Sequence, residues 1–170
     1  MHRALPIALL LAVAGCSHHG RPASASAAAP DGRAFVYGVV EVPAELGPAA
    51  CVALIEADHE RATGARHGCV PATADGLFWA EDVAPIRWVV DGVLAGGTLR
   101  RFPGAAFAVA PGSLHEWGVA RLEPAPAGGA RLVPLSRPTR AEVLRRLLAQ
   151  DRIAARWKER IRERLEALPR

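Results

Sequence analysis

The sequence predicts a mainly β protein, in which an antiparallel β-sandwich of about seven to nine short strands precedes a long amphipathic C-terminal α-helix. Two observations lead to this prediction. Between residues 34 and 136, runs of β-branched and aromatic residues recur at roughly 8–12-residue spacing, and Pro or Gly bounds each run. From residue 139 onward the apolar residues lie mostly three and four positions apart, which is the spacing of one helix face.

The chain divides into four expected segments. Residues 1–15 form a signal peptide, residues 16–33 a flexible tether, residues 34–136 the β-sandwich and residues 137–170 the C-terminal helical segment. The tether is rich in small and polar residues, contains proline and lacks apolar periodicity. One domain is sufficient for a chain of 170 residues, and a core of that size is sustainable.

The N-terminal segment has the pattern of a secretory signal. Residues 1–3 supply a positive start, and the apolar run 5–13 is too short to span a bilayer, which needs about 20 apolar residues. The run leads into the letters VAGC, in which a branched residue and two small residues precede Cys16. This ending resembles the bacterial lipobox.

The lipobox resemblance implies that Cys16 becomes a lipid anchor. In that family the cysteine sulfur receives a diacylglycerol, the signal is cut just before the cysteine, and the new amino group is acylated. Each buried acyl methylene contributes about 0.8 kcal/mol, so two or more chains hold a protein stably on a bilayer. In lipoproteins of two-membrane envelopes, an Asp after the lipidated cysteine commonly marks retention in the inner membrane. Ser17 follows Cys16 here, so the resemblance implies the outer membrane. We expect the domain to face the periplasm.

The expected strands follow one another with turn residues between them. They are residues 34–42, 50–58, 65–72, 76–83, 86–93, 96–102, 106–112, 115–123 and 130–135. Residues 59–64 are typical of a turn. Alternation with period two places Ile86, Trp88 and Val90 on one face of their strand.

The two remaining cysteines predict a disulfide. Cys51 and Cys69 lie downstream of a secretory signal, in an oxidising compartment. If the chain reverses near Glu60, the two cysteines lie opposite each other on paired strands, as a disulfide requires. Closing this loop contributes about 3 kcal/mol in the chain-entropy model. The alternative is two separate reduced thiols.

Positive charge is concentrated at the C-terminal end. Residues 16–138 hold 10 basic and 12 acidic residues, a net charge of −2, whereas residues 139–170 hold 10 basic and 5 acidic residues, a net charge of +5. The aromatic residues do not alternate with the basic ones as base-stacking platforms would. We therefore expect no nucleic-acid partner.

The C-terminal helix is expected to begin with a capping box. Thr139 and Glu142 have the T-x-x-E spacing, and an apolar stripe follows to residue 168. Gln150 and Asp151 interrupt the stripe, so a bend or a second N-cap at Asp151 is one alternative. Pro169 ends the helix.

Three interpretations of the apolar stripe remain open. The stripe covers one sheet or an open edge of the sandwich, it docks a partner or a second copy, or it lies on anionic lipid. For the second interpretation the candidate contact residues are Trp157, Ile161 and Leu165.

A second resemblance rests on the segment VPATADGLFWAEDVAP, residues 70–85, together with VYGVVEVP and ACVALIEAD. Thr73, Asp75, Gly76 and Phe78 form a T-x-D-G-x-F pattern. The Asp-Gly pair suits a tight turn with positive φ, and we expect Phe78 to enter the core between the sheets. Together these segments resemble the carboxypeptidase-regulatory-like, or transthyretin-like, β-sandwich. That resemblance implies a non-catalytic module for folding, assembly or binding.

The patterns that would indicate an enzyme are incomplete. HERAT and HEWGV each begin like the zinc-binding H-E-x-x-H, but Thr63 and Val119 stand where the second histidine is required. We therefore expect no enzyme, cofactor or metal. The alternative from another class is a small metal-dependent envelope hydrolase that uses the hairpin 56–67, with ligands from Glu56, Asp58, His59 and His67.

The expected function is that of a membrane-anchored envelope lipoprotein acting as a non-enzymatic binding or assembly module. Its expected partners are the lipid bilayer, through acylated Cys16, and an envelope protein, through the C-terminal helix.

Overall fold

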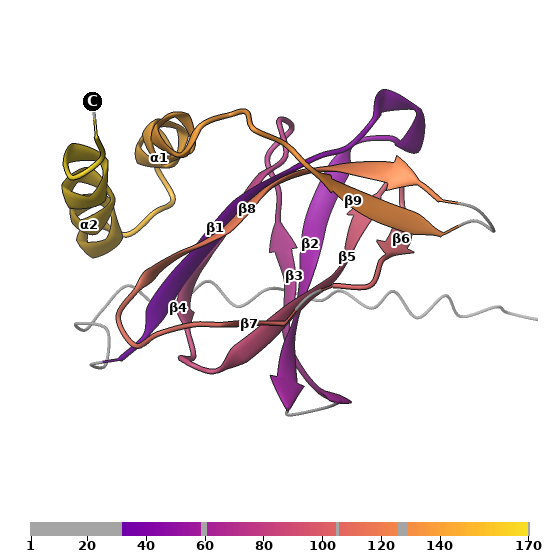
Figure 1. The fold of residues 1–170 in the computed structure, drawn as a ribbon, viewed down its shortest axis with the longest axis horizontal. Coiled ribbons are helices and arrows are strands. Elements are labelled where there is room, and N and C mark those ends of the chain that lie inside the picture. The colour runs from indigo at the N-terminus through magenta and orange to yellow at the C-terminus, as the bar shows by residue number, and fades with distance from the viewer. Residues whose placement is uncertain (1–31, 59–60, 105, 126–128, 170) are drawn as a thin grey trace, which may run out of the picture.

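The computed structural model describes residues 32–58, 61–104, 106–125 and 129–169, and the side chains of residues 58–67 lie outside the description. The described chain forms three layers (Figure 1): a five-stranded sheet, a four-stranded sheet packed against it, and two C-terminal helices on the outer face of the four-stranded sheet. A mainly β fold of two packed sheets with a helical C-terminal segment is therefore confirmed.

The four-stranded sheet has the order β4-β1-β8-β9. Its strands are β1 (Ala34–Glu41), β4 (Leu77–Val83), β8 (Leu114–Pro124) and β9 (Ala130–Pro134). Strands β1 and β8 are parallel, whereas the other pairs are antiparallel. The prediction of a wholly antiparallel sandwich was wrong at this one pairing, because strand direction depends on a long connection that residue patterns do not reveal.

The five-stranded sheet has the order β3-β2-β5-β6, and β7 also pairs with β5. Its strands are β2 (Ala49–Asp58), β3 (Arg61–Pro71), β5 (Arg87–Ala95), β6 (Thr98–Arg101) and β7 (Ala106–Ala108). A short 3-10 turn, Ala44–Leu46, connects β1 to β2. Strand β3 begins at Arg61, within the residues 59–64 that were expected to be a turn, so the turn prediction was wrong from Arg61 onward.

Strand β1 is buried on both faces, which explains its unbroken apolar run. Ala34, Val36 and Val40 belong to the core between the two sheets. Phe35 and Tyr37 point the other way and belong to a second core beneath the helices. A strand covered on both sides needs no alternation of apolar and polar residues.

The T-x-D-G-x-F segment forms the expected turn between β3 and β4. Gly76 has φ of 77°, and a Cβ there would lie 2.1 Å from the carbonyl oxygen of Val40. The Thr73 hydroxyl accepts a hydrogen bond from the backbone N–H of Leu77 at 3.0 Å. Phe78 is 1% exposed in the core between the sheets. Both expectations for this segment are confirmed.

The predicted faces of β5 are also correct. Trp88 is 4% exposed and Val90 is fully buried between the sheets, and Ile86 packs against the same core.

The C-terminal segment forms two helices, so the prediction of one long helix was wrong. Helix α1 spans Arg140–Leu148 and begins with the expected capping box between Thr139 and Glu142. Helix α2 spans Ala155–Glu166, and its N-cap is Ala154, not Asp151. Glu81 of β4 accepts the N–H of Ala154 at 3.3 Å, so a carboxylate from the sheet caps α2. This contact bridges 73 residues, which sequence periodicity cannot show.

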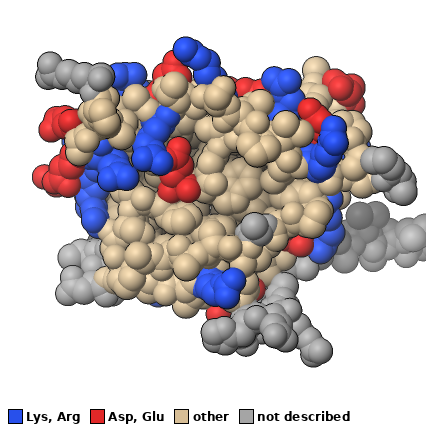
Figure 2. All heavy atoms as spheres, in the orientation of Figure 1, with Lys and Arg blue, Asp and Glu red and all other residues tan. Residues whose placement is uncertain are grey.

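Basic side chains gather over the two helices, at the left of Figure 2, with acidic ones among them, while much of the middle of that face carries no charge. Within the described part of the chain, no helix has the length and apolar character needed to cross a membrane.

Candidate functional site

An apolar groove lies on the outer face of the five-stranded sheet, on the side away from the helices. Val52, Val90 and Val93 face the core between the sheets. Because successive side chains of a strand point to opposite faces, their neighbours point outward. The groove encloses about 440 Å³ and is lined by Ala53, Leu54, Ile55, Gly68, Cys69, Asp91, Leu94, Leu99 and Arg101.

One wall of the groove contains Leu99, which is 40% exposed and is the most exposed large hydrophobic side chain in the described part of the chain. Leu99 lies opposite Leu94 in the β5–β6 ladder, so both side chains are on the same face. An ion pair closes the rim, with Asp91 and Arg101 at 2.9 Å. The groove therefore offers an apolar surface with one charged pair at its edge.

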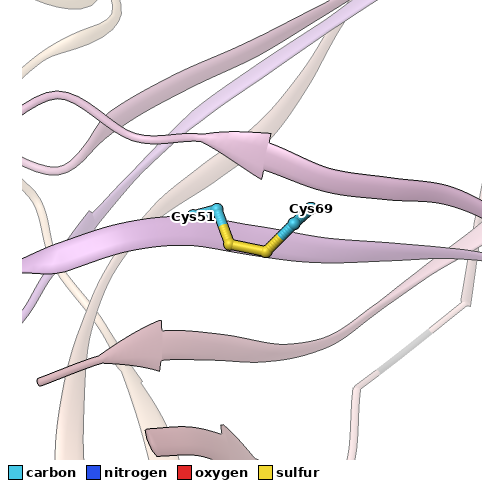
Figure 3. The surroundings of a disulfide bond; sticks show 2 residues. All are labelled: Cys51 and Cys69. Atoms are coloured by element: carbon cyan, nitrogen blue, oxygen red, sulfur yellow. A yellow bond between two sulfur atoms is a disulfide. The ribbon is translucent and has the colours of Figure 1, made fainter. Parts of the chain in front are cut away.

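The disulfide ties the edge strand of this groove to its floor. Cys51 and Cys69 are joined, and their Cα atoms lie 5.3 Å apart (Figure 3). Cys69 lies opposite Ala53 and not opposite Cys51, because two register shifts in the hairpin displace β3 along β2. The predicted disulfide is confirmed, although the cysteines are diagonal neighbours.

The three candidate contact residues of the C-terminal segment are not a free surface. Trp157 is 2% exposed and Ile161 is fully buried, and Leu165 packs against the same core. The Trp157 ring lies 5.4 Å from the ring of Phe35, centroid to centroid. The stripe covers the four-stranded sheet, so the assignment of Trp157 and Ile161 as partner contacts does not fit this structure.

Charged contacts at the rim hold the helices on the sheet. Arg156 of α2 lies 2.6 Å from the Asp82 carboxylate on β4, and Arg146 of α1 pairs with Asp75 in the preceding turn at 2.5 Å. On the other side of the layer, Arg140 pairs with Glu116 of β8. Several basic residues of the segment are thus used for internal packing.

Burial beneath the helices raises the pKa values of two side chains, Tyr37 and Glu81. Burial, with a smaller effect from the Glu116 carboxylate, raises the pKa of Tyr37 to about 12. Burial also raises the pKa of Glu81. Near the start of β8, burial lowers the pKa of His115, whose ring stacks on Phe107 at 4.8 Å between ring centres. None of these three groups lines the apolar groove.

Most of the residues of the hydrolase alternative lie outside the description, so the structure does not place them together as a site. His59 and the side chains of Asp58 and His67 lie outside the described residues, and only Glu56 is described. Within the described chain, no three His, Cys, Asp or Glu side chains are grouped as metal ligands would be. Cys16 also lies outside the described residues.

Comparisons with known proteins give little guidance. No family model and no curated protein matches this chain. Among solved structures, a crystal structure of a candidate cell adhesion protein from Bacteroides fragilis matches with 10% sequence identity and a TM-score of 0.38. The match covers 62% of this chain and 46% of the other, so this chain spans less than half of its length. No fold or role is transferred at that level of similarity.

Sequence reasoning did not find the groove, and a signal for it exists. Leu94 and Leu99 flank the turn Gly96-Gly97, at positions that a tight hairpin places opposite each other. The sequence does not indicate which sheet the C-terminal segment covers. In the structure it covers the four-stranded sheet, so the outer face of the five-stranded sheet stays open.

Proposed function

We propose that the chain is a lipid-anchored envelope protein whose β-sandwich acts as a non-enzymatic binding module. The lipobox-like ending at Cys16 supports the anchor, and the following tether of small and polar residues supports a domain held away from the bilayer. The absence of Asp after Cys16 favours the outer membrane, and we propose that the domain faces the periplasm.

The apolar groove on the five-stranded sheet is the observation that carries the binding role. A soluble protein rarely leaves a contiguous apolar hollow open, because covering apolar area contributes roughly 25 cal/mol per Å². The helices cover the other sheet, and the groove keeps Leu99 exposed. We assign the groove to an envelope protein that inserts apolar side chains between β2 and β6, with the Asp91–Arg101 pair at the rim.

We further propose that the sandwich is of the transthyretin-like type. The turn from Thr73 to Phe78 and the strands before it support this assignment. The resemblance implies a non-catalytic module, which agrees with a binding role for the groove.

Site-specific photo-crosslinking in living cells tests the binding role. A photoreactive residue replaces Leu99 in the groove, and the matched control replaces Arg131, which is exposed on β9 of the other sheet. We expect a discrete protein adduct from position 99 and none from position 131. A second substitution, Ala53→Arg, fills the groove floor and is expected to remove the adduct, whereas Ala167→Arg on the helical layer is not. Identical adduct patterns at positions 99 and 131 would rule out the groove as the contact surface.

A further inference from the structure

A second hollow lies on the opposite side of the molecule from the apolar groove, where α2 meets the turn that leads into β8. It encloses about 390 Å³ and is lined by Ser113, Leu114, Arg160, Glu163 and Arg164. Two guanidinium groups and one carboxylate line it, so the pocket carries one net positive charge. Arg160, Glu163 and Arg164 are not among the residues that pack the helices against the sheet.

The helical spacing explains why two arginines meet here. Arg156, Arg160 and Arg164 are four residues apart and form one row beside the buried stripe of α2. Arg156 is paired with Asp82, whereas Arg160 and Arg164 have no ion pair within the described chain. The next two members of the row are therefore available to an anion from outside.

Packing orients Arg160 toward the turn. Its guanidinium carbon lies 5.7 Å from the centre of the Trp157 ring, over a side chain that is fixed in the core. Its Nη1 atom is 3.5 Å from the position that a Cβ would take at Gly112. The Ser113 hydroxyl donates to the carbonyl of Ala110 at 2.7 Å, which holds the turn closed. The pocket is thus built on a strand, a closed turn and a packed helix.

The pocket also lies beside the point where the tether enters the sandwich. A Cβ at Gly32 would be 3.9 Å from the Cβ of Pro111, in the same turn that forms the pocket. Residues 17–31 separate Gly32 from Cys16, and a fully extended chain of that length reaches about 55 Å at roughly 3.5 Å per residue. A domain anchored through Cys16 can therefore bring this pocket to the membrane surface.

We propose that this pocket binds the phosphate of an anionic lipid headgroup in the membrane that holds the Cys16 anchor. This inference rests on the proposed lipid anchor. Guanidinium groups form charge-assisted hydrogen bonds with phosphate oxygens, and each basic residue near an anionic membrane contributes about 1 kcal/mol. The apolar face of α2 stays buried in the protein, so the contact is electrostatic and requires no insertion into the acyl region.

Vesicle flotation of the mature chain, residues 16–170 with Cys16→Ser, tests the pocket without help from acyl chains. The vesicles are phosphatidylcholine with or without phosphatidylglycerol. We expect binding to the anionic vesicles only. The double substitution Arg160→Gln and Arg164→Gln is expected to weaken it by roughly tenfold or more, and Glu163→Gln to strengthen it by about fivefold.

A matched control removes the same charge elsewhere. Arg145→Gln with Arg152→Gln changes two exposed arginines of the helical segment that do not line the pocket, and we expect less than a threefold effect. Equal losses from the two pairs would overturn the proposal in favour of diffuse attraction, as would binding of inorganic phosphate without any preference for anionic vesicles. Because these proteins carry no acyl group and keep the groove intact, failure here leaves the proposed anchor and groove unaffected.

Discussion

Tyr37 and Trp157 show how single residues join the helices to the sheet. Tyr37, the one tyrosine of the chain, is 1% exposed on β1, and Trp157 of α2 is 2% exposed in the same core. Phe35 contacts both aromatic rings, at 6.2 Å from Tyr37 and 5.4 Å from Trp157 between ring centres. The core between the helices and the four-stranded sheet is therefore aromatic at its centre. Its residues govern how firmly the helices are held on the sheet, and Tyr37 makes the stability of the protein depend on pH.

We predict that stability falls at high pH because of Tyr37. Its pKa in the folded state is about 12, above the ordinary value of 10.0, so the folded protein holds this proton more tightly than the unfolded chain. The contribution is complete below pH 10 and is lost as the pH rises through about 12. The free energy of unfolding, measured by urea titration across this range, is expected to decline less in Tyr37→Phe than in the natural chain. Tyrosinate absorbance that titrates near the ordinary value in the folded protein would contradict the burial of this phenol.

We predict that Trp157→Ala lowers the free energy of unfolding by roughly 3–5 kcal/mol, because it leaves a large cavity between α2 and β1. Glu159→Ala, two residues along the same helix on its exposed side, is expected to change it by less than about 0.5 kcal/mol. Denaturant unfolding of both variants measures the difference. Similar values for the two would mean that α2 is not packed on the sheet.

At the scale of elements, local patterns predict strands and caps, and long-range contacts decide the rest. The Thr139–Glu142 capping box and the Asp75-Gly76 turn were predictable because each involves residues within four positions of one another. The interruption at Gln150 and Asp151 indicated a bend as an alternative, but the start of α2 at Ala155 was not predictable, because Glu81 of β4 provides the cap and Ile153 turns into the core.

Register is the second feature that local patterns miss. Symmetry about Glu60 correctly predicted that Cys51 and Cys69 bond, but the register shifts within the hairpin make them diagonal neighbours. Likewise, the apolar stripe of the C-terminal segment indicated that something is covered. The stripe did not indicate which of the two sheets it covers, so it could not show which sheet carries the open groove.

We predict that the disulfide stabilises the β2–β3 pair and with it the groove. Replacing both cysteines, Cys51→Ser with Cys69→Ser, is expected to lower the free energy of unfolding by about 3 kcal/mol, because the bond closes a loop with a sequence separation of 18. Thermal unfolding of the natural chain with and without reductant provides the matched comparison. An unchanged midpoint after complete reduction would contradict this role.

On the scale of the whole molecule, the three layers give the protein two different outer sides. One side is the helical layer, which carries most of the excess positive charge and lies beside the start of β1 (Figures 1 and 2). The other is the five-stranded sheet with its apolar groove. With the proposed lipid contact at Arg160 and Arg164, the charged side faces the bilayer and the groove faces a protein partner, so the two contacts do not compete.

The lipid anchor is the claim on which the envelope role depends, and the mass of the native protein tests it most directly. Intact mass spectrometry of the protein extracted from its host's membranes is predicted to show a chain that begins at Cys16 and carries a diacylglycerol and an N-linked acyl group. An unmodified Cys16, or a full-length chain recovered from the cytosol, would contradict the account.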